Sequence, residues 1–167
     1  VTDSAPEVII NPLKYLARAG WTLSPDLHAG SKVMRGLAKA KGLSLLYMSP
    51  RGPVLSAFAK WIVRSTKGVD PRWDNSYWTK EKLDLLDTDE VMRIASLPVR
   101  DCDRFFVQSK WGITIDEQIE MENYFNARNT LGEIRSPLIM RKCAEANPHW
   151  ALNWHTHTEV LPRGAPR

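Results

Sequence analysis

The stretch Asp87–Phe106, DTDEVMRIASLPVRDCDRFF, predicts two short helices that meet at Leu97–Pro98. Glu90 follows Asp87 at the spacing of a capping box, which marks the start of the first helix. Pro98 ends that helix, because the residue before a proline avoids the helical conformation, and it suits the first turn of the next helix. The stretch is therefore a compact helical corner without a catalytic grouping, which is typical of a part held within something larger.

The second helix of this corner carries both an apolar stripe and a charged pair. Residues at three-to-four spacing, with a second aromatic beside them, are expected to face the core: Val99, Cys102, Phe106, Ser109 and Phe105. Asp103 and Arg104 point about 100° apart on a helix, so each needs a partner of its own. Arg104 suits bidentate binding of a helix end or an acidic surface. Asp103 and Arg104 are thus candidate partner contacts, with exposed charges as the alternative.

Start and stop signals predict five further helices, over 12–19, 31–41, 53–67, 116–131 and 136–147. Ser31 and Asp116 suit N-caps, because their side-chain oxygens can accept from the free N–H groups of a first turn. Gly42 suits a helix end. The inner face of 31–41 is expected to hold Val33, Met34, Leu37 and Ala38.

No segment shows a convincing strand pattern, so the expected fold class is all-α. We expect a small irregular helical domain of about four to six helices with extended N- and C-terminal arms. Residues 1–52 would form an N-terminal arm with one or two basic helices, residues 53–147 the helical domain, and residues 148–167 an extended C-terminal tail.

The composition is that of a globular chain. With 167 residues, 43% hydrophobic and 25% charged, it fits one domain or one domain with tails. Its longest nearly uncharged apolar run, Gly42–Met48, is far shorter than the roughly 20 residues that cross a bilayer. Cys102 and Cys143 make no disulfide framework, which favours a reducing compartment and small buried thiols. The first residue is Val1, which fits a cleaved organellar leader or a missing start.

Charge is segregated along the chain. No acidic residue lies between Asp26 and Asp70, but eight basic residues do, so this basic block carries +8 and the other residues −4. Its members are Lys32, Arg35, Lys39, Lys41, Arg51, Lys60, Arg64 and Lys67. Such a block favours a polyanion, an acidic protein face or an anionic lipid surface, with a solvated helix face as the alternative. Basic and aromatic residues do not alternate here as they do in single-strand binders, and no zinc spacing or nucleic-acid motif is present.

The segment 53–67 combines an apolar stripe with a basic one. The apolar stripe holds residues at helical spacing, namely Val54, Leu55, Phe58, Trp61 and Ile62. Lys60, Arg64 and Lys67 line another face, which makes them candidate contacts for anionic lipid or another polyanion. Packing of this helix against a partner subunit or its own core is the preferred alternative.

Seven tryptophans are scattered along the chain without a repeat. Large aromatic residues away from a single core often anchor contacts with partners. Five of the seven are candidate partner contacts: Trp61, Trp73, Trp78, Trp150 and Trp154. Core packing is the alternative for part of this set.

No grouping of residues predicts catalysis or a bound cofactor. The Gly30–Lys32 segment lacks the preceding glycines of a phosphate loop. His155 and His157 make a weak metal site, because no Cys or carboxylate lies at ligand spacing. The acidic residues of 116–122 lie in the first turns of a predicted helix, where carboxylates commonly favour the helix dipole. We therefore expect no catalytic, cofactor-binding or metal-ligating residue, and no enzyme.

Three short motifs resemble one known family. Leu97–Pro98 followed by Asp103–Arg104 and Phe106 resembles a pattern of the subunit 7 family of mitochondrial respiratory complex III, also called the ubiquinone-binding protein family of ubiquinol–cytochrome c reductase. Pro53–Ser56 is similar to the start of the first helix in some members, and Pro137 lies about where the family has a proline opening its last helix. The resemblance covers about residues 53–146, and the family's second Leu-Pro has no counterpart near Ile113–Glu122.

The resemblance implies a non-catalytic structural or assembly subunit of complex III. Such a subunit is a peripheral protein on the matrix side of the mitochondrial inner membrane, packs against cytochrome b and the core subunits, and carries no haem or metal. The basic block would suit anionic lipid such as cardiolipin. The alternatives are a mitochondrial ribosomal protein that binds rRNA through the basic block, or an accessory subunit of another respiratory complex or of ATP synthase. A soluble enzyme is the least favoured alternative.

Overall fold

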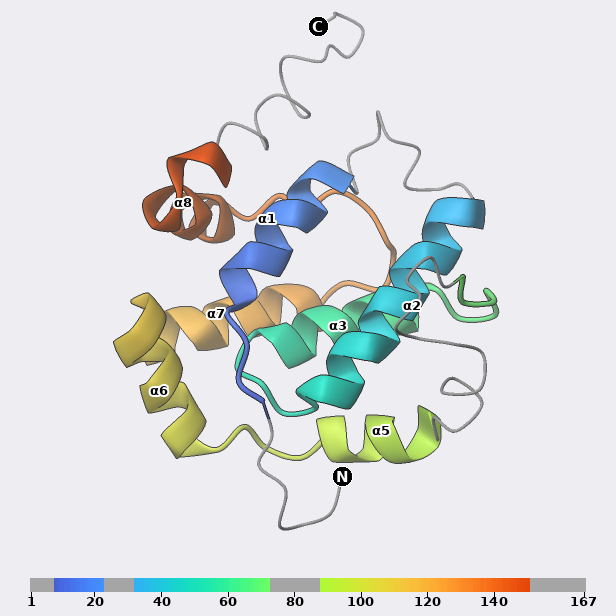
Figure 1. The fold of residues 1–167 in the computed structure, drawn as a ribbon, viewed down its shortest axis with the longest axis horizontal. Coiled ribbons are helices and arrows are strands. Elements are labelled where there is room, and N and C mark those ends of the chain that lie inside the picture. The colour runs from blue at the N-terminus through green and yellow to red at the C-terminus, as the bar shows by residue number, and fades with distance from the viewer. Residues whose placement is uncertain (1–7, 23–31, 73–87, 151–167) are drawn as a thin grey trace, which may run out of the picture.

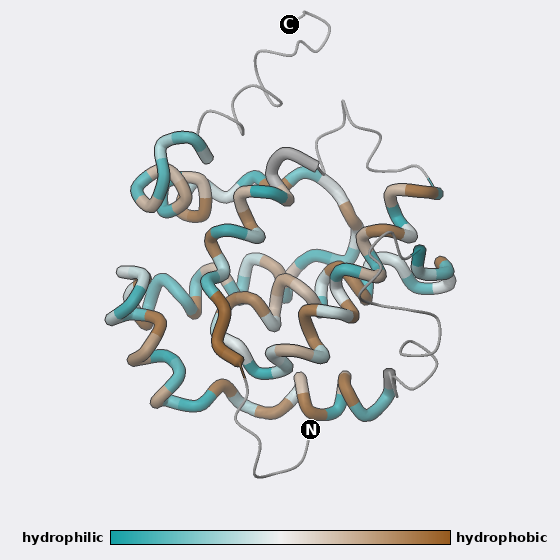
Figure 2. The backbone as a smooth tube through the Cα atoms, viewed as in Figure 1, coloured by the Kyte–Doolittle hydropathy of each residue, from teal (hydrophilic) through white to brown (hydrophobic). Residues whose placement is uncertain are grey.

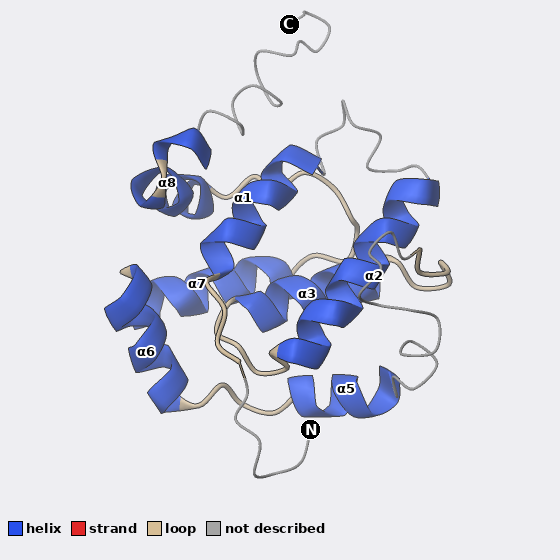
Figure 3. Ribbon diagram, viewed as in Figure 1, coloured by secondary structure: helices blue, strands red, loops and turns tan. Residues whose placement is uncertain are grey.

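A computed structural model describes residues 8–22, 32–72 and 88–150. Within these ranges the chain contains helices and no strands, which confirms the all-α prediction (Figures 1 and 3). The helices are α1 (Pro12–Thr22), α2 (Lys32–Met48), α3 (Leu55–Ser65), α5 (Thr88–Ala95), α6 (Asp101–Trp111), α7 (Ile115–Asn126) and α8 (Pro137–Ala146). None of the helices searched in these ranges is both long and apolar enough to span a bilayer.

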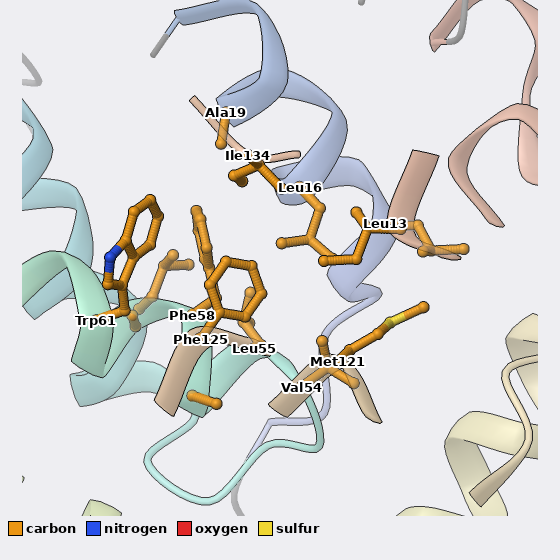
Figure 4. Packing of buried hydrophobic residues seen from close by; sticks show 14 of the residues in the cluster. Leu13, Leu16, Ala19, Val54, Leu55, Phe58, Trp61, Met121, Phe125 and Ile134 are labelled. Carbon is orange, nitrogen blue, oxygen red and sulfur yellow. The ribbon is translucent and has the colours of Figure 1, made fainter. Parts of the chain in front are cut away.

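Helix α3 lies at the centre and packs against α1, α2, α5 and α7. The predicted apolar stripe of this helix is confirmed, because its members are almost completely buried. Phe58 and Trp61 from α3 meet Phe125 from α7, with ring centroids 5.3–6.0 Å apart (Figure 4). Brown, apolar segments of several helices converge on this region in Figure 2.

Residues 12–48, which we expected to belong to an N-terminal arm, contribute to the same core. Leu13 and Leu16 of α1 and Leu45 and Leu46 of α2 are at most 1% exposed and belong to the same hydrophobic cluster as the α3 residues (Figure 4). α1 also packs against α8 near the other end of the described chain. The hydrophobic core therefore extends across the boundary that we expected at residue 53.

Helix α2 differs from the prediction in both its length and its buried face. It runs through Gly42 to Met48, because Gly42 lies where α2 crosses α3. A Cβ at Gly42 would lie 3.1 Å from both Ile62 and Val63 and 3.2 Å from the Ala59 carbonyl oxygen. The glycine thus permits close helix packing and does not end the helix. The expected inner face is confirmed only in part: Ala38 packs against the core, Val33 is exposed, and most of the buried residues of α2 lie between Ala40 and Leu46.

Several predicted helix ends are confirmed, and others move by a few residues. Gly112 ends α6 with a left-handed φ of 69°, and the Ser136 side chain caps α8 by accepting from the Ile139 N–H at 3.2 Å. α7 begins at a Thr114 cap instead of Asp116, and it ends at Asn126, five residues before the predicted 131.

The secondary structure around Pro98 and Pro148 also differs from the prediction. Pro98 lies in the link between α5 and α6, because α6 begins only at Asp101. Residues 148–150 are helical, so the chain is not extended directly after α8. Asp87, the predicted start of the corner, lies outside the described residues.

Candidate functional site

Four of the eight residues of the basic block donate hydrogen bonds to backbone carbonyl oxygens of this chain. Two of them contact the C-terminal end of α3. Arg35 Nη2 donates to the Ser65 carbonyl oxygen at 2.9 Å, and Lys39 Nζ donates to the Thr66 carbonyl oxygen at 3.2 Å. Both cations come from α2, which lies beside α3. The last carbonyl groups of a helix lack partners and carry the negative end of its dipole, so cations stabilise them.

Two further members of the block stabilise the ends of α5 and α7. Lys60 Nζ donates to the carbonyl oxygen of Ala95, the last residue of α5, at 2.8 Å. Arg64 Nη2 donates to the carbonyl oxygens of Phe125 and Arg128 at 2.9 and 2.7 Å. Partial burial lowers the pKa of Lys60 below its ordinary value of 10.5. These two cations therefore join α3 to the helices on either side.

The proposed polyanion stripe is not a single exposed face in this fold. Lys60 is half-buried and Arg64 is occupied by backbone carbonyls, whereas Lys67 is exposed and makes no hydrogen bond or ion pair within the described residues. The contact of all three with lipid or another polyanion stays a prediction, although the Lys60 ammonium donates to a helix end. Of the three, Lys67 alone has a side chain that makes no hydrogen bond within the described residues.

Asp103 and Arg104 lie on the inner side of α6 and are both held by this chain. Arg104 Nη2 lies 2.8 Å from Glu122 Oε1, and Arg104 Nη1 lies 3.1 Å from Glu122 Oε2. Arg104 also donates to the Gln118 side chain at 3.3 Å, and the Arg100 guanidinium donates to Asp103 at 2.8 Å. The bidentate partner expected for Arg104 is therefore a carboxylate of α7, and this pair joins α6 to α7.

The same Glu122 carboxylate supports a strained turn at the start of α3. Val54 has φ 66° and ψ −51°, the one positive φ of a non-glycine residue among those described. The Leu55 N–H donates to the Pro53 carbonyl oxygen at 2.6 Å, which makes the turn a γ-turn of the rare, strained form. The Val54 N–H donates to Glu122 Oε2 at 2.9 Å. This hydrogen bond and complete burial of the side chain hold the turn.

The outer side of α6 exposes its aromatic residues. Phe105 is 58% exposed and Phe106 is 45% exposed, and Leu97 in the preceding link is 42% exposed. Within α6, Asp103 and Val107 are the residues buried instead. The prediction that the core is faced by Cys102, Phe105, Phe106 and Ser109 was therefore wrong, and Asp103 and Val107 lie on the inner side of α6 instead. We call Cys102, Phe105 and Phe106 the outer face of α6.

Of the tryptophans predicted to contact partners, two lie within the described residues and three lie outside them. Trp61 is completely buried and donates from its indole N–H to the Thr130 carbonyl oxygen at 3.1 Å, so it is not available to a partner in this fold. Trp150 is half-buried and packs against the core. Trp73, Trp78, Trp154, His155 and His157 lie outside the described residues. Among the described residues, the exposed aromatic residues are thus Tyr47, Phe105 and Phe106, and Trp61 is not one of them.

Glu117 and Cys143 are titratable groups whose contacts are structural. No group of three His, Cys, Asp or Glu side chains among the described residues could hold a metal ion. Glu117 takes part in a capping box, accepting the Thr114 N–H at 2.9 Å while its own N–H donates to the Thr114 hydroxyl. Burial raises the pKa of the Cys143 thiol to about 12, so this cysteine stays protonated and unreactive.

Comparison with known proteins found no matching family model, curated protein or solved structure. The geometry of α6 and the resemblance of its sequence are therefore the basis for a functional proposal.

Proposed function

We propose that this chain is a non-catalytic structural subunit of a larger assembly, and that it docks on its neighbours through the outer face of α6. The observation that carries this proposal is the exposure of Phe105 and Phe106 on a helix whose inner side is held by Arg104. Burial of one phenylalanine side chain contributes about 1.5–3 kcal/mol. A partner that covers Phe105 and Phe106 gains the burial energy of both side chains. Because the helix that carries them is already held in place, binding does not first have to order it.

The resemblance of the corner supports a specific assembly. The motif Leu97–Pro98, Asp103–Arg104 and Phe106 resembles the subunit 7 family of mitochondrial respiratory complex III, and its Phe106 lies on the outer face of α6. We propose that the chain is a subunit of this kind, on the matrix side of the inner membrane and in contact with cytochrome b and the core subunits. The catalytic chemistry of that complex belongs to its other subunits.

The use of the basic block inside the fold weighs against rRNA as the main partner. Arg35, Lys39, Lys60 and Arg64 all donate to carbonyl groups of this chain. An rRNA-binding protein needs free cations, because release of counterions from phosphates drives its affinity. A docking role through apolar residues fits the described surface better than a polyanion-binding role.

Native-gel fractionation of mitochondrial membranes with mass spectrometry tests the proposal. The chain is expected to migrate with cytochrome b, and to remain bound after a salt wash that strips RNA-binding proteins. Replacement of Phe105 and Phe106 by Ser should release it, whereas Val33→Ser, at an exposed apolar residue of α2, should not. Migration with ribosomal proteins would overturn the subunit proposal. Migration with a different respiratory complex would overturn the assignment to complex III.

A further inference from the structure

The two helices α5 and α6 and the link between them, which we call the α5–α6 unit, contribute few side chains to the core. They follow one another along the lower left edge of the molecule in Figure 1. Among residues 89–111, those buried are Ala95, Asp103 and Val107, and three more are partly buried against the core, namely Val91, Met92 and Trp111. Helix α3, by contrast, buries eight of its eleven residues. Segments with few buried apolar contacts open locally at a low free energy, so polar anchors matter more for this unit than for α3.

Two cation contacts anchor the unit to the rest of the protein, one for each helix. Lys60 of α3 donates from Nζ to the carbonyl oxygen of Ala95, the last residue of α5, at 2.8 Å. Arg104 of α6 binds both carboxylate oxygens of Glu122 on α7, and Gln118 of α7 adds hydrogen bonds to the side chain and the carbonyl oxygen of Arg104. A charge left unpaired in a shielded site is costly, so Arg104 can leave Glu122 readily only if another cation replaces it.

Lys60 is the cation placed to replace Arg104. Helix α3 packs against α7, and Glu122 accepts the N–H of Val54 at the start of α3, so its carboxylate lies beside the helix that carries Lys60. Burial lowers the pKa of Lys60, and the negative charge of Glu122 opposes this effect, so the two charges interact in the closed structure. The ammonium of a lysine sits on a flexible four-carbon stem, which allows it to exchange the Ala95 oxygen for the Glu122 carboxylate.

We propose that the α5–α6 unit opens as one piece when Arg104 leaves Glu122 and Lys60 moves from the Ala95 carbonyl oxygen to Glu122. The exchange keeps Glu122 paired in the open state, and it frees α5 because the ammonium leaves Ala95 to reach the carboxylate. Both helices are thereby released together while the other helices stay packed. One carboxylate with two alternative cations gives the element two discrete arrangements, which is what a conformational switch requires.

This switch would also control the surface that we propose for docking. Phe105 and Phe106 belong to α6, so they keep a fixed position only while the unit is closed. The opening itself follows from the anchors and does not rest on the docking proposal. It can therefore be tested on the full chain without a partner.

Amide hydrogen exchange of the full chain, followed by mass spectrometry, tests the opening. The amides of α5 and α6 should share one opening equilibrium and exchange at least about tenfold faster than those of α3. Ile134 is completely buried and lies near Leu16 of α1, away from the unit (Figure 4). Ile134→Val should therefore speed exchange in α3 about severalfold and leave the unit unchanged, because it weakens the closed and open states equally.

Substitution of the two cations tests the exchange of partners. Arg104→Gln should speed exchange at least about tenfold in both α6 and α5, although Arg104 belongs to α6 alone. In a Lys60→Met background the same substitution should act on α6 only, because α5 has already lost its anchor. Arg93→Gln removes an exposed ion pair of α5 and is the matched control, which should change neither rate by more than about twofold. If Arg104→Gln unfolds the chain, Arg104→Lys keeps the charge without the bidentate contact and takes its place.

Four results would overturn the proposal. Equal exchange in α3 and the unit, or an equal effect of Ile134→Val on both, would show that the unit unfolds only with the whole protein. Fast exchange confined to the helix ends would assign it to fraying. Acceleration of α6 alone by Arg104→Gln in the parent chain would show that the two helices open separately. Acceleration of α5 that persists in the Lys60→Met background would exclude Lys60 as the link.

Discussion

The carboxylate of Glu122 on α7 binds the guanidinium of Arg104 on α6, with Nη2 and Oε1 2.8 Å apart. Both side chains are about nine-tenths shielded from solvent, with 14% and 13% of their surface exposed. The second carboxylate oxygen accepts both Arg104 Nη1 and the N–H of Val54. One ion pair thereby joins α6, α7 and the strained start of α3, and it determines which side of α6 faces outward.

Glu122→Gln should destabilise the fold by about 2–3 kcal/mol, because it leaves a shielded guanidinium without its countercharge and weakens the support of the Val54 turn. The free energy of unfolding in urea measures this loss. Glu90→Gln is the matched control, since its partner Arg93 and Glu90 itself are largely exposed, and it should change stability within experimental error. Equal effects of the two substitutions would contradict the structural role of the Arg104–Glu122 pair.

Arg64→Met should lower the free energy of unfolding by about 1–2 kcal/mol, since Arg64 donates to carbonyl oxygens at the end of α7. Lys67→Met removes the same charge one turn away, where the side chain makes no hydrogen bond or ion pair within the described residues. It should leave unfolding unchanged. A loss of stability in Lys67→Met as large as in Arg64→Met would refute the idea that the position of the cation matters.

Gly42→Val should destabilise the protein by about 1–3 kcal/mol, because the added side chain meets Ile62, Val63 and the Ala59 carbonyl where α2 crosses α3. Thermal unfolding followed by circular dichroism measures the effect. Gly132→Val is the control, since nothing lies within 4 Å of its Cβ position. Equal stability of the two variants would contradict the close crossing of α2 and α3 at Gly42.

Glu117 should make the free energy of unfolding depend on pH in the acidic range. The N–H of Thr114, and then the ammonium of Lys142, hold the pKa of the Glu117 carboxyl below its ordinary value of 4.5, against the opposing effect of burial. A carboxyl whose pKa is lowered on folding contributes stability above pH 4.5, and this contribution disappears as the pH falls through the lower folded value. Urea unfolding between pH 3 and pH 6 should therefore show a weaker pH dependence in Glu117→Gln. Glu120→Gln, at an exposed side chain of the same helix, should behave like the parent chain.

The two cysteines should differ in reactivity. Cys102 is exposed on the outer face of α6, whereas Cys143 is completely buried and has a pKa raised to about 12. Titration of the folded chain with a disulfide reagent should therefore modify one thiol rapidly, and Cys102→Ser should abolish that phase. Denaturation should expose the second thiol. Rapid reaction of the folded Cys102→Ser variant would place Cys143 at the surface and contradict the packing of α8 against α1.

Much of the local structure could be predicted because it depends on short-range patterns. The stripe of α3 from Val54 to Ile62, the Ser136 cap and the Gly112 helix end all follow from residues within one or two turns of each other. The candidate site could be predicted only in part. Its position at the Leu97–Phe106 corner stays a prediction, and the buried side of α6 was predicted wrongly, because apolar periodicity favoured Phe106 over Asp103.

The sequence by itself determined that the chain is helical and where most helices begin and end, since caps, prolines and helical spacing act between neighbours in the chain. Only the tertiary structure decided that Gly42 separates two crossing helices, that Arg35, Lys39, Lys60 and Arg64 serve helix ends, and that Phe105 and Phe106 face outward. Each of these depends on residues brought together from distant parts of the chain. Arg104 and Glu122, for example, lie 18 residues apart, so the apolar pattern of one helix does not predict the ion pair between them.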